Sequence, residues 1–230
     1  MGVSLKLTID DYRNTIIQGN VLDKLKELPS DSVDMCITSP PYWNLRDYGF
    51  EPAIWDEDPT CHHVWSPINN KCFDCTAWKG QLGHESSYQL FIKHLVDIFT
   101  ETARVLKPTG TLWINIGDTY ASTPKGNKEP SGLQSKNYGI GENVPMKRNV
   151  SYGKVQQKSL IGIPDRLKIA LIDAGFICRN EIIWHKPNAM PSSAKDRFTN
   201  DSEKLYFFTK NKKYYFEQQF EPHSEESIRD

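Results

Sequence analysis

The stretch NTIIQGNVLDKLKELPSDSVDMCITSPPYW, residues 14–43, decides the fold class of this chain. Its first six residues have Ile16 and Ile17 at their centre and predict a short buried strand. Residues 21–28 carry apolar side chains at helical spacing, and residues 32–38 form a second apolar run that ends at two prolines. Proline offers no N–H to a sheet, so the second strand stops there. A strand, a helix and a strand within so short a length predict a βαβ unit and a parallel sheet.

The rest of the chain extends this α/β pattern. Apolar residues recur every three or four positions over 86–106, which predicts a long helix, and residues 163–174 predict another, with Pro164 in its first turn and Gly175 after its end. We expect further strands over 111–116, 176–184, 204–209 and 213–217, the last two as a terminal hairpin. The stretch 119–159 has seven Lys or Arg against two Glu and few apolar residues, and we interpret it as a mobile basic loop.

Size and composition limit the function classes. The chain has 230 residues, 38% of them hydrophobic, which suits a single domain over residues 1–230. The net charge of -1 means that any nucleic-acid contact must come from local basic patches. Five cysteines without an export signal indicate reduced thiols and a cytoplasmic location. No apolar run approaches the ~18 residues that a membrane span needs.

The residues after the second strand carry the chemistry. Ser39, Pro40, Pro41 and Tyr42 follow it directly, at the carboxyl edge of a sheet where α/β folds bind ligands. An amino group attached to an aromatic ring is a poor nucleophile, and two hydrogen-bond acceptors beside its hydrogens favour the tetrahedral form that can react. The Ser39 hydroxyl and the Pro40 carbonyl can be those acceptors, and Tyr42 offers a face for stacking. The competing interpretation is a Pro-Pro turn with an aromatic neighbour, but the preceding strand favours a site.

Four groups of residues resemble a known family, the DNA amino-methyltransferases of the permuted class β. The matching segments are residues 19–22 with 28–29 and 32–34, then 38–43, 104–113, and the pair 183–188 and 196–200. The resemblance implies a partial Rossmann-like methyltransferase sheet with helices on both faces and a Cys/His insertion. It also implies transfer of a methyl group from S-adenosyl-L-methionine to the exocyclic amino group of a flipped base, in a restriction-modification system or a phage. In that family the Ser form of the tetrapeptide goes more often with N4-cytosine than with N6-adenine.

The resemblance assigns roles residue by residue. Ser39, Pro40, Pro41 and Tyr42 become the catalytic set, and Asn20 and Ser39 become cofactor contacts, although the family usually has Asp at the position of Asn20. Double-stranded DNA is the implied partner, and its expected contacts are Trp43, Arg46, Lys186 and Arg197.

One family feature is missing from the sequence. The cofactor loop, Asp-Pro-Phe followed by a Gly-rich turn, is not found, and the GIG at 139–141 has no strand before it. We therefore expect an incomplete S-adenosyl-L-methionine site, two missing strands between 14–19 and 32–38, and a second polypeptide segment that supplies the glycine-rich loop. The alternatives are a non-catalytic nucleic-acid-binding module and methylation of RNA or of a protein amide.

A second cluster has metal-ligand spacing. Cys61 and His63 are followed by Cys72 and Cys75, and four such ligands suit a closed tetrahedral zinc. His62 could replace His63. The zinc would fold the insertion at 55–80, which lacks a core of its own; the alternative is a reduced loop without metal. No cysteine follows a proline, which argues against the covalent route of carbon-5 cytosine methylation.

Overall fold

The computed structural model describes residues 8–121 and 150–220. In chain order the elements are a 3-10 turn (Ile9–Tyr12), α1 (Val21–Glu27), β1 (Val33–Thr38), β2 (Ala53–Trp55), β3 (Trp78–Gly80), α2 (Tyr88–Val105), β4 (Leu106–Ile116), α3 (Ile163–Asp173), β5 (Ile177–His185) and β6 (Ser202–Thr209). The predicted α/β class is confirmed, and so are the three main helices and the strands equivalent to β1, β4 and β5.

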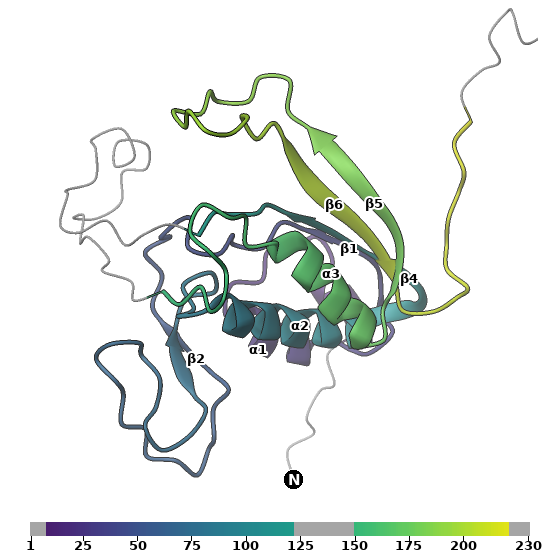
Figure 1. The fold of residues 1–230 in the computed structure, drawn as a ribbon. Helices are drawn as coiled ribbons and strands as arrows, with labels where there is room; N and C mark the ends of the chain where they lie inside the picture. The colour runs from purple at the N-terminus through teal and green to yellow at the C-terminus, as the bar shows by residue number, and fades with distance from the viewer. Residues whose placement is uncertain (1–7, 122–149, 221–230) are drawn as a thin grey trace, which may run out of the picture.

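The main sheet has the order β1-β4-β6-β5 (Figure 1). β1 and β4 are parallel and joined through α2, whereas β6 is antiparallel to both of its neighbours. The sheet is therefore mixed rather than parallel throughout. β6 differs in direction because no helix crosses over between β5 and β6, so the chain returns alongside the strand that it has just left.

Two predicted strands are wrong. Residues 15–18 are extended but join no strand in the part of the chain that the structure describes, and Ile16 is 99% exposed. Residues 213–217 are not the partner of β6, which lies between β4 and β5 instead. They form an irregular segment in which the Tyr215 N–H donates to the carbonyl of Thr109 (3.0 Å).

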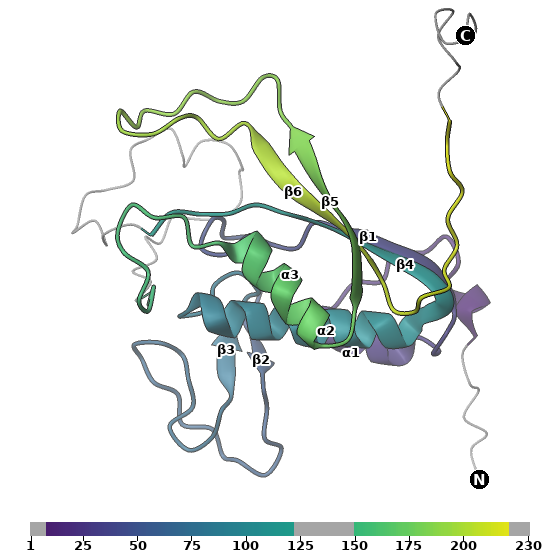
Figure 2. The same cartoon turned by 45° about the vertical axis from the view of Figure 1, so that its right-hand side comes forward.

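The helices α1, α2 and α3 lie on one face of the main sheet (Figures 1 and 2). Leu112 and Ile114 of β4 and Phe208 of β6 face them and are fully buried. On the other face, Trp113 stacks on Phe207 with 4.2 Å between ring centroids. Aromatic side chains of the segment after β6, Tyr214 and Phe216, contact Phe207 there. The expectation of helices on both faces is thus corrected for the described residues, because an extended segment covers part of the second face.

The helix ends are capped as their sequences suggest. The Ser87 hydroxyl accepts the N–H of Leu90 at the start of α2 (3.3 Å), and Asn20 does the same for Leu22 at the start of α1 (2.9 Å). α3 begins after Gly162, whose φ of +78° suits glycine, and the Asp118 carboxylate accepts the N–H groups of Gly162 and Ile163. Asp118, which follows β4, therefore caps the start of α3.

β1 is an open edge of the sheet. Met35 and Ile37 on this strand are 54% and 67% exposed. Beside them runs a groove of about 510 Å³, lined almost entirely by apolar side chains of α1, β1 and α2. An unpaired strand next to an apolar groove is a surface that other polypeptide readily covers.

Most of the predicted basic loop, residues 122–149, lies outside the described residues. Its two ends are joined, because the Ala121 N–H donates to the carbonyl of Ser159 (2.8 Å). Each described helix is either too short or too polar to cross a lipid bilayer.

Candidate active site

Several strand ends meet at one edge of the main sheet. The carboxyl ends of β1, β4 and β5 lie there together with the first residues of β6, since Ile116 pairs with Lys204 and His185 pairs with Ser202. The Ser39–Tyr42 tetrapeptide follows β1 at this edge, as the sequence predicted. The edge therefore gathers residues that are up to 161 positions apart in the chain.

Tyr42 has two acceptor oxygens next to its hydroxyl, which can donate its single hydrogen to only one of them at a time. Its hydroxyl oxygen lies 3.1 Å from Oδ1 of Asn115 and 3.0 Å from Oε2 of Glu203. Burial raises the pKa of Tyr42 to about 12, the Ser39 hydrogen bond works against the rise and the Glu203 carboxylate adds to it. Tyr42 is therefore a neutral phenol at physiological pH, which suits a positioning or stacking role and not that of a base.

Glu203 links Tyr42 to a cation. Its second carboxylate oxygen accepts a hydrogen bond from the Lys186 ammonium. Burial tends to raise the pKa of Glu203, but the hydrogen bonds from Lys186 and Tyr42 outweigh it, and the net shift is downward. Lys186, one of the predicted nucleic-acid contacts, is thus held beside the tetrapeptide through Glu203.

The tetrapeptide has two sides. Pro40 and Pro41 line the apolar groove at the β1 edge. Ser39 is exposed, with its hydroxyl 3.5 Å from Oδ1 of Asn115, and so lies with Tyr42 rather than with the groove. Ser39 is therefore open to a ligand at the sheet edge, whereas Tyr42 is half-buried and packs partly against the core.

Gly117 sets the position of the Tyr42 ring. A β-carbon on Gly117 would lie 2.6 Å from Cε2 of Tyr42, well inside van der Waals contact. The Tyr42 side chain is therefore positioned by its hydrogen bond to Asn115, and the absence of a side chain at Gly117 leaves room for its ring.

Replacing Gly117 with alanine should lower the free energy of unfolding by about 1–3 kcal/mol, the usual scale for overpacking a well-filled site. Urea unfolding measures the change. In a Tyr42→Ala background the same replacement should have almost no effect, because the clashing ring is gone. Equal losses in both backgrounds would show that the ring does not pack on Gly117.

Trp43 is placed differently from its predicted role as a nucleic-acid contact. It is only 2% exposed, its Nε1 donates to the carbonyl of Glu85 (3.0 Å), and its ring makes edge contacts with Tyr88 and Tyr152. The side chain anchors the tetrapeptide loop to the helix layer and has no surface to offer to DNA in this structure.

Of the other predicted nucleic-acid contacts, Arg46 and Arg197 are exposed and Lys186 is partly buried. The Arg197 guanidinium lies over the ring of Tyr120 at 4.0 Å, and Tyr120 is in turn near Asn200 (3.3 Å between side-chain oxygens). Arg46 is close enough to Tyr42 for its positive charge to lower the pKa of the phenol. Asn20, the predicted cofactor contact, uses its side-chain oxygen for the α1 cap and is followed by Val21, which lines the groove.

Sequence reasoning missed Asn115, Gly117 and Glu203. Asn115 lies on the face of β4 away from the helices, and strand alternation alone could have placed it there. Glu203 had no comparable signal, because its position depends on how β6 pairs with β4.

The four predicted metal ligands lie in the segment between β2 and β3.

Comparison with known proteins shows the family of the chain. A family model described as DNA methylase, of the N6/N4 type, matches residues 33–229. The chain is 40% identical over 203 residues to the type II methyltransferase M.Cfr9I of Citrobacter freundii, and the match covers 88% of this chain and 56% of that protein. It is 37% identical over 207 residues to M.SmaI of Serratia marcescens, with 88% and 58% covered.

Among solved structures, a putative DNA modification methylase from Thermus thermophilus, complexed with S-adenosyl-L-methionine, is similar at 20% identity with a TM-score of 0.47. The match covers 87% of this chain and 55% of that one. The chain thus spans a little more than half the length of the curated relatives described above.

Proposed function

Because the chain belongs to the N6/N4 family of DNA methylases, we propose that it forms the target-base part of a DNA amino-methyltransferase. One observation carries the proposal. Ser39 stands exposed at the carboxyl end of β1, beside a tyrosine that Asn115 and Glu203 hold in place. This is an arrangement of acceptors and an aromatic face at a sheet edge, and it suits a flat heterocycle with an amino group.

In this proposal the chain's own residues activate the amino group. The Ser39 hydroxyl and the Pro40 carbonyl accept its two hydrogens and favour a tetrahedral nitrogen, whose lone pair is then available. Tyr42 stacks on the base, which must leave the duplex because stacking hides the amino group. No residue needs to act as a strong base, and the neutral Tyr42 phenol is consistent with that.

S-adenosyl-L-methionine would supply the methyl group as an electrophile when bound. The groove beside β1 has a volume typical of small-molecule sites, and Val21, Thr38 and Pro40 give it a wall that suits the apolar surface of a nucleoside. The side-chain oxygen of Asn20 is used in the helix cap, so its contact with a cofactor would come from the amide nitrogen. The lining described here has hardly any polar groups for a ribose and a charged amino acid. The fit is therefore partial.

We further propose that additional polypeptide covers the β1 edge and completes the cofactor site. Exposed Met35 and Ile37 on an unpaired strand, with an apolar groove beside them, support this. The added segment could belong to the same protein or to a partner, and it would bring the polar groups that the groove lacks.

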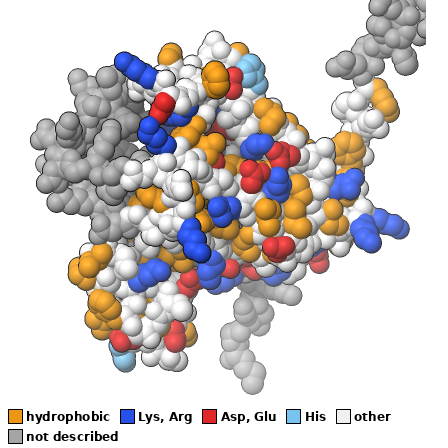
Figure 3. Space-filling model, viewed as in Figure 1, with side chains coloured by type: hydrophobic (Ala, Val, Ile, Leu, Met, Phe, Trp, Pro, Cys, Tyr) orange, Lys and Arg blue, Asp and Glu red, His pale blue; other side chains and the backbone are white. Residues whose placement is uncertain are grey.

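The substrate in this proposal is double-stranded DNA, with N4 of cytosine favoured over N6 of adenine because the tetrapeptide begins with serine. Three basic residues support a nucleic-acid contact. Lys186 is bound to Glu203 beside Tyr42, Arg46 lies near Tyr42, and Arg197 lies over the ring of Tyr120. On the face seen in Figure 3, the described Lys and Arg side chains are interspersed with Asp and Glu. Because the whole chain has a net charge of -1, DNA would be held by local basic contacts. The type II relatives favour a role in restriction-modification.

The test uses the complete natural gene product that contains this chain. It is incubated with duplex DNA and methyl-labelled S-adenosyl-L-methionine, and the DNA is digested to nucleosides. We expect the label in N4-methylcytosine, or failing that in N6-methyladenine. Label at carbon 5 of cytosine, in RNA or protein alone, or DNA binding without any transfer would contradict the proposal.

A further inference from the structure

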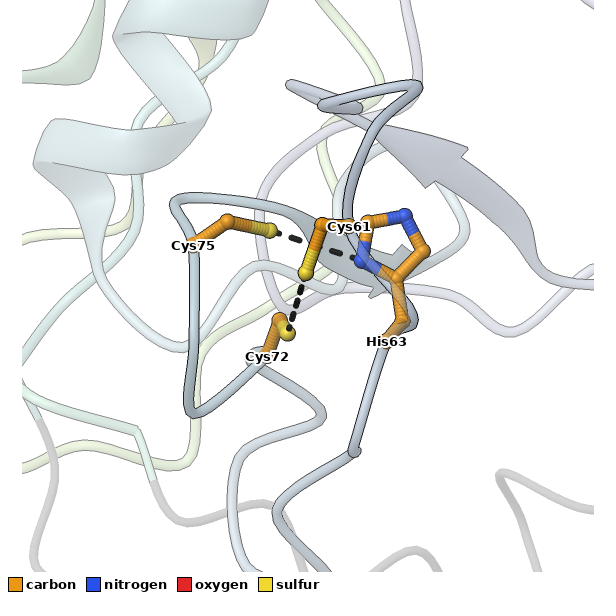
Figure 4. Close-up of side chains that lie close together, drawn as sticks. All are labelled: Cys61, His63, Cys72 and Cys75. Atoms are coloured by element: carbon orange, nitrogen blue, oxygen red, sulfur yellow. Dashed lines mark hydrogen bonds between the residues drawn. The ribbon is translucent and has the colours of Figure 1, made fainter.

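Four potential metal ligands converge in the insertion between β2 and β3 (Figure 4). Cys61 and His63 come from one side of the insertion, and Cys72 and Cys75 from the other. The ligand atoms of all four lie within 4.8 Å of one another. The Cys61 and Cys72 sulfurs are 3.8 Å apart, and the Cys75 sulfur is 3.4 Å from Nδ1 of His63.

The two closest separations match a tetrahedral zinc site. Zinc binds thiolate sulfur at about 2.3 Å and imidazole nitrogen at about 2.0 Å, which places tetrahedral ligands roughly 3.4–3.8 Å apart. The two measured pairs fall in that range. Three sulfurs and one imidazole fill all four positions, which is typical of a structural zinc and leaves no place for a substrate.

Backbone N–H groups are directed at two of the sulfurs. The N–H of Asp74 donates to the Cys72 sulfur and the N–H of Ala77 to the Cys75 sulfur, each at 3.4 Å. Such donors also suit a sulfur that binds a metal ion, because metal-bound sulfur carries negative charge.

The two neighbouring histidines are clearly distinguished. His63 directs Nδ1 at the cysteines, and its buried Nε2 has no hydrogen-bond partner among the described residues; the Glu57 carboxylate is 3.9 Å away. His62 is exposed and does not belong to the cluster. The structure therefore selects His63 from the two candidates that the spacing left open.

The insertion has little else to hold it together. β2 and β3 have three residues each, and a two-stranded pair of that length is marginal by itself. Trp55 and Trp78 are buried, but both pack toward His94 of α2, at the base of the insertion. The part beyond them, residues 56–77, has backbone hydrogen bonds and an isolated bridge between Trp65 and Cys72, but its buried hydrophobic residues are only Cys72 and Ala77.

The base of the insertion continues into the loop that supports the tetrapeptide. Trp55 Nε1 donates to the carbonyl of Gly80 (3.0 Å), and three residues later the carbonyl of Gly83 accepts the N–H of Asn44 (2.8 Å). A β-carbon on Gly83, whose φ is +91°, would lie 3.1 Å from the carbonyl oxygen of Tyr42. Glu85, fully buried with His94, also accepts the Gly83 N–H (2.9 Å). An ordered insertion would therefore restrict the movement of the backbone at Tyr42.

We propose that Cys61, His63, Cys72 and Cys75 bind one zinc ion, which folds the insertion and thereby steadies the loop behind Tyr42. The ion is structural and takes no part in bond making or breaking. The inference stands on the ligand geometry and does not depend on the proposed methyl transfer.

The first test is metal analysis of the full chain purified without chelators. We expect one zinc per chain by elemental mass spectrometry. Cobalt replacement should give the sulfur-to-cobalt charge-transfer absorption of a tetrahedral thiolate site. The variants Cys72→Ser and His63→Ala should lose most of the zinc, whereas the matched controls Cys178→Ser and His62→Ala should keep it.

The role in folding has its own readout. Chelation should open residues 56–77 to limited proteolysis while the β1-β4-β6-β5 sheet stays protected, and zinc should reverse the change. His63→Cys, which preserves four ligands, should retain zinc and protection even if other variants fold poorly. A chain that purifies without zinc and takes up neither zinc nor cobalt, or loss of metal in His62→Ala but not in His63→Ala, would overturn the proposal.

Discussion

Ser39→Ala should lower the rate of methyl transfer by about 10²–10³-fold, the scale of losing one preorganised hydrogen-bonding group in an active site. The hydroxyl acts on the amino group mainly in the transition state, so the loss should appear in kcat more than in KM. Initial rates with the complete natural gene product and labelled S-adenosyl-L-methionine measure it.

The matched control for this prediction is Ser159→Ala. Ser159 is also exposed, and its hydroxyl donates only to the neighbouring Leu160 carbonyl in the contacts described. The control should keep the parent rate, and neither variant should change the urea midpoint, because both side chains are at the surface. If Ser39→Ala stays within about threefold of the parent rate, Ser39 is not the acceptor that the mechanism requires.

Trp43→Ala should lower the free energy of unfolding by about 3–5 kcal/mol, the range for truncating a buried large aromatic side chain. Trp43 is 2% exposed and also donates a hydrogen bond to Glu85, so its removal leaves both a cavity and an unmet acceptor. Urea unfolding followed by circular dichroism measures the change.

The comparison variant is Trp184→Ala, in which the same residue type is removed from an exposed position. Trp184 is 56% exposed on β5, and we expect its loss to change the free energy of unfolding by less than about 1 kcal/mol. Similar losses in the two variants would mean that Trp43 does not anchor the tetrapeptide loop, and its original interpretation as a DNA contact would become tenable again.

Periodicity and capping predicted the helices well. α2 repeats apolar residues on one face and begins at a serine cap, and α3 lies between Gly162 and Gly175 with Pro164 near its start. Such signals are local, so they depend little on the rest of the fold. β1 was predicted for the same reason, since two prolines stop it.

Strand pairing was predicted less well. The two adjacent isoleucines in 14–19 suggest burial, but the segment becomes a strand only if a neighbour supplies hydrogen bonds, and none of the described residues does so. The residues after β6 have strand-like composition, yet β4 and β5 already occupy both edges of β6. Which strand pairs with which is a property of the whole sheet and cannot be read from either segment alone.

The candidate site shows the same division. The tetrapeptide was found because strand, prolines and tyrosine are contiguous. Asn115 and Glu203 were missed because they reach Tyr42 from 73 and 161 residues away, through the pairing of β4 and β6. Trp43 was assigned to the surface because it follows the motif directly, whereas the turn after Pro41 directs it into the core.

A crystal structure of the complete gene product, with target duplex and an unreactive cofactor analogue, tests the central claim most directly. We predict an extruded base stacked on Tyr42, with its amino nitrogen about 3 Å from both the Ser39 hydroxyl and the Pro40 carbonyl oxygen. A target base that remains stacked in the duplex, or an extruded base whose amino group contacts neither oxygen, would contradict the account.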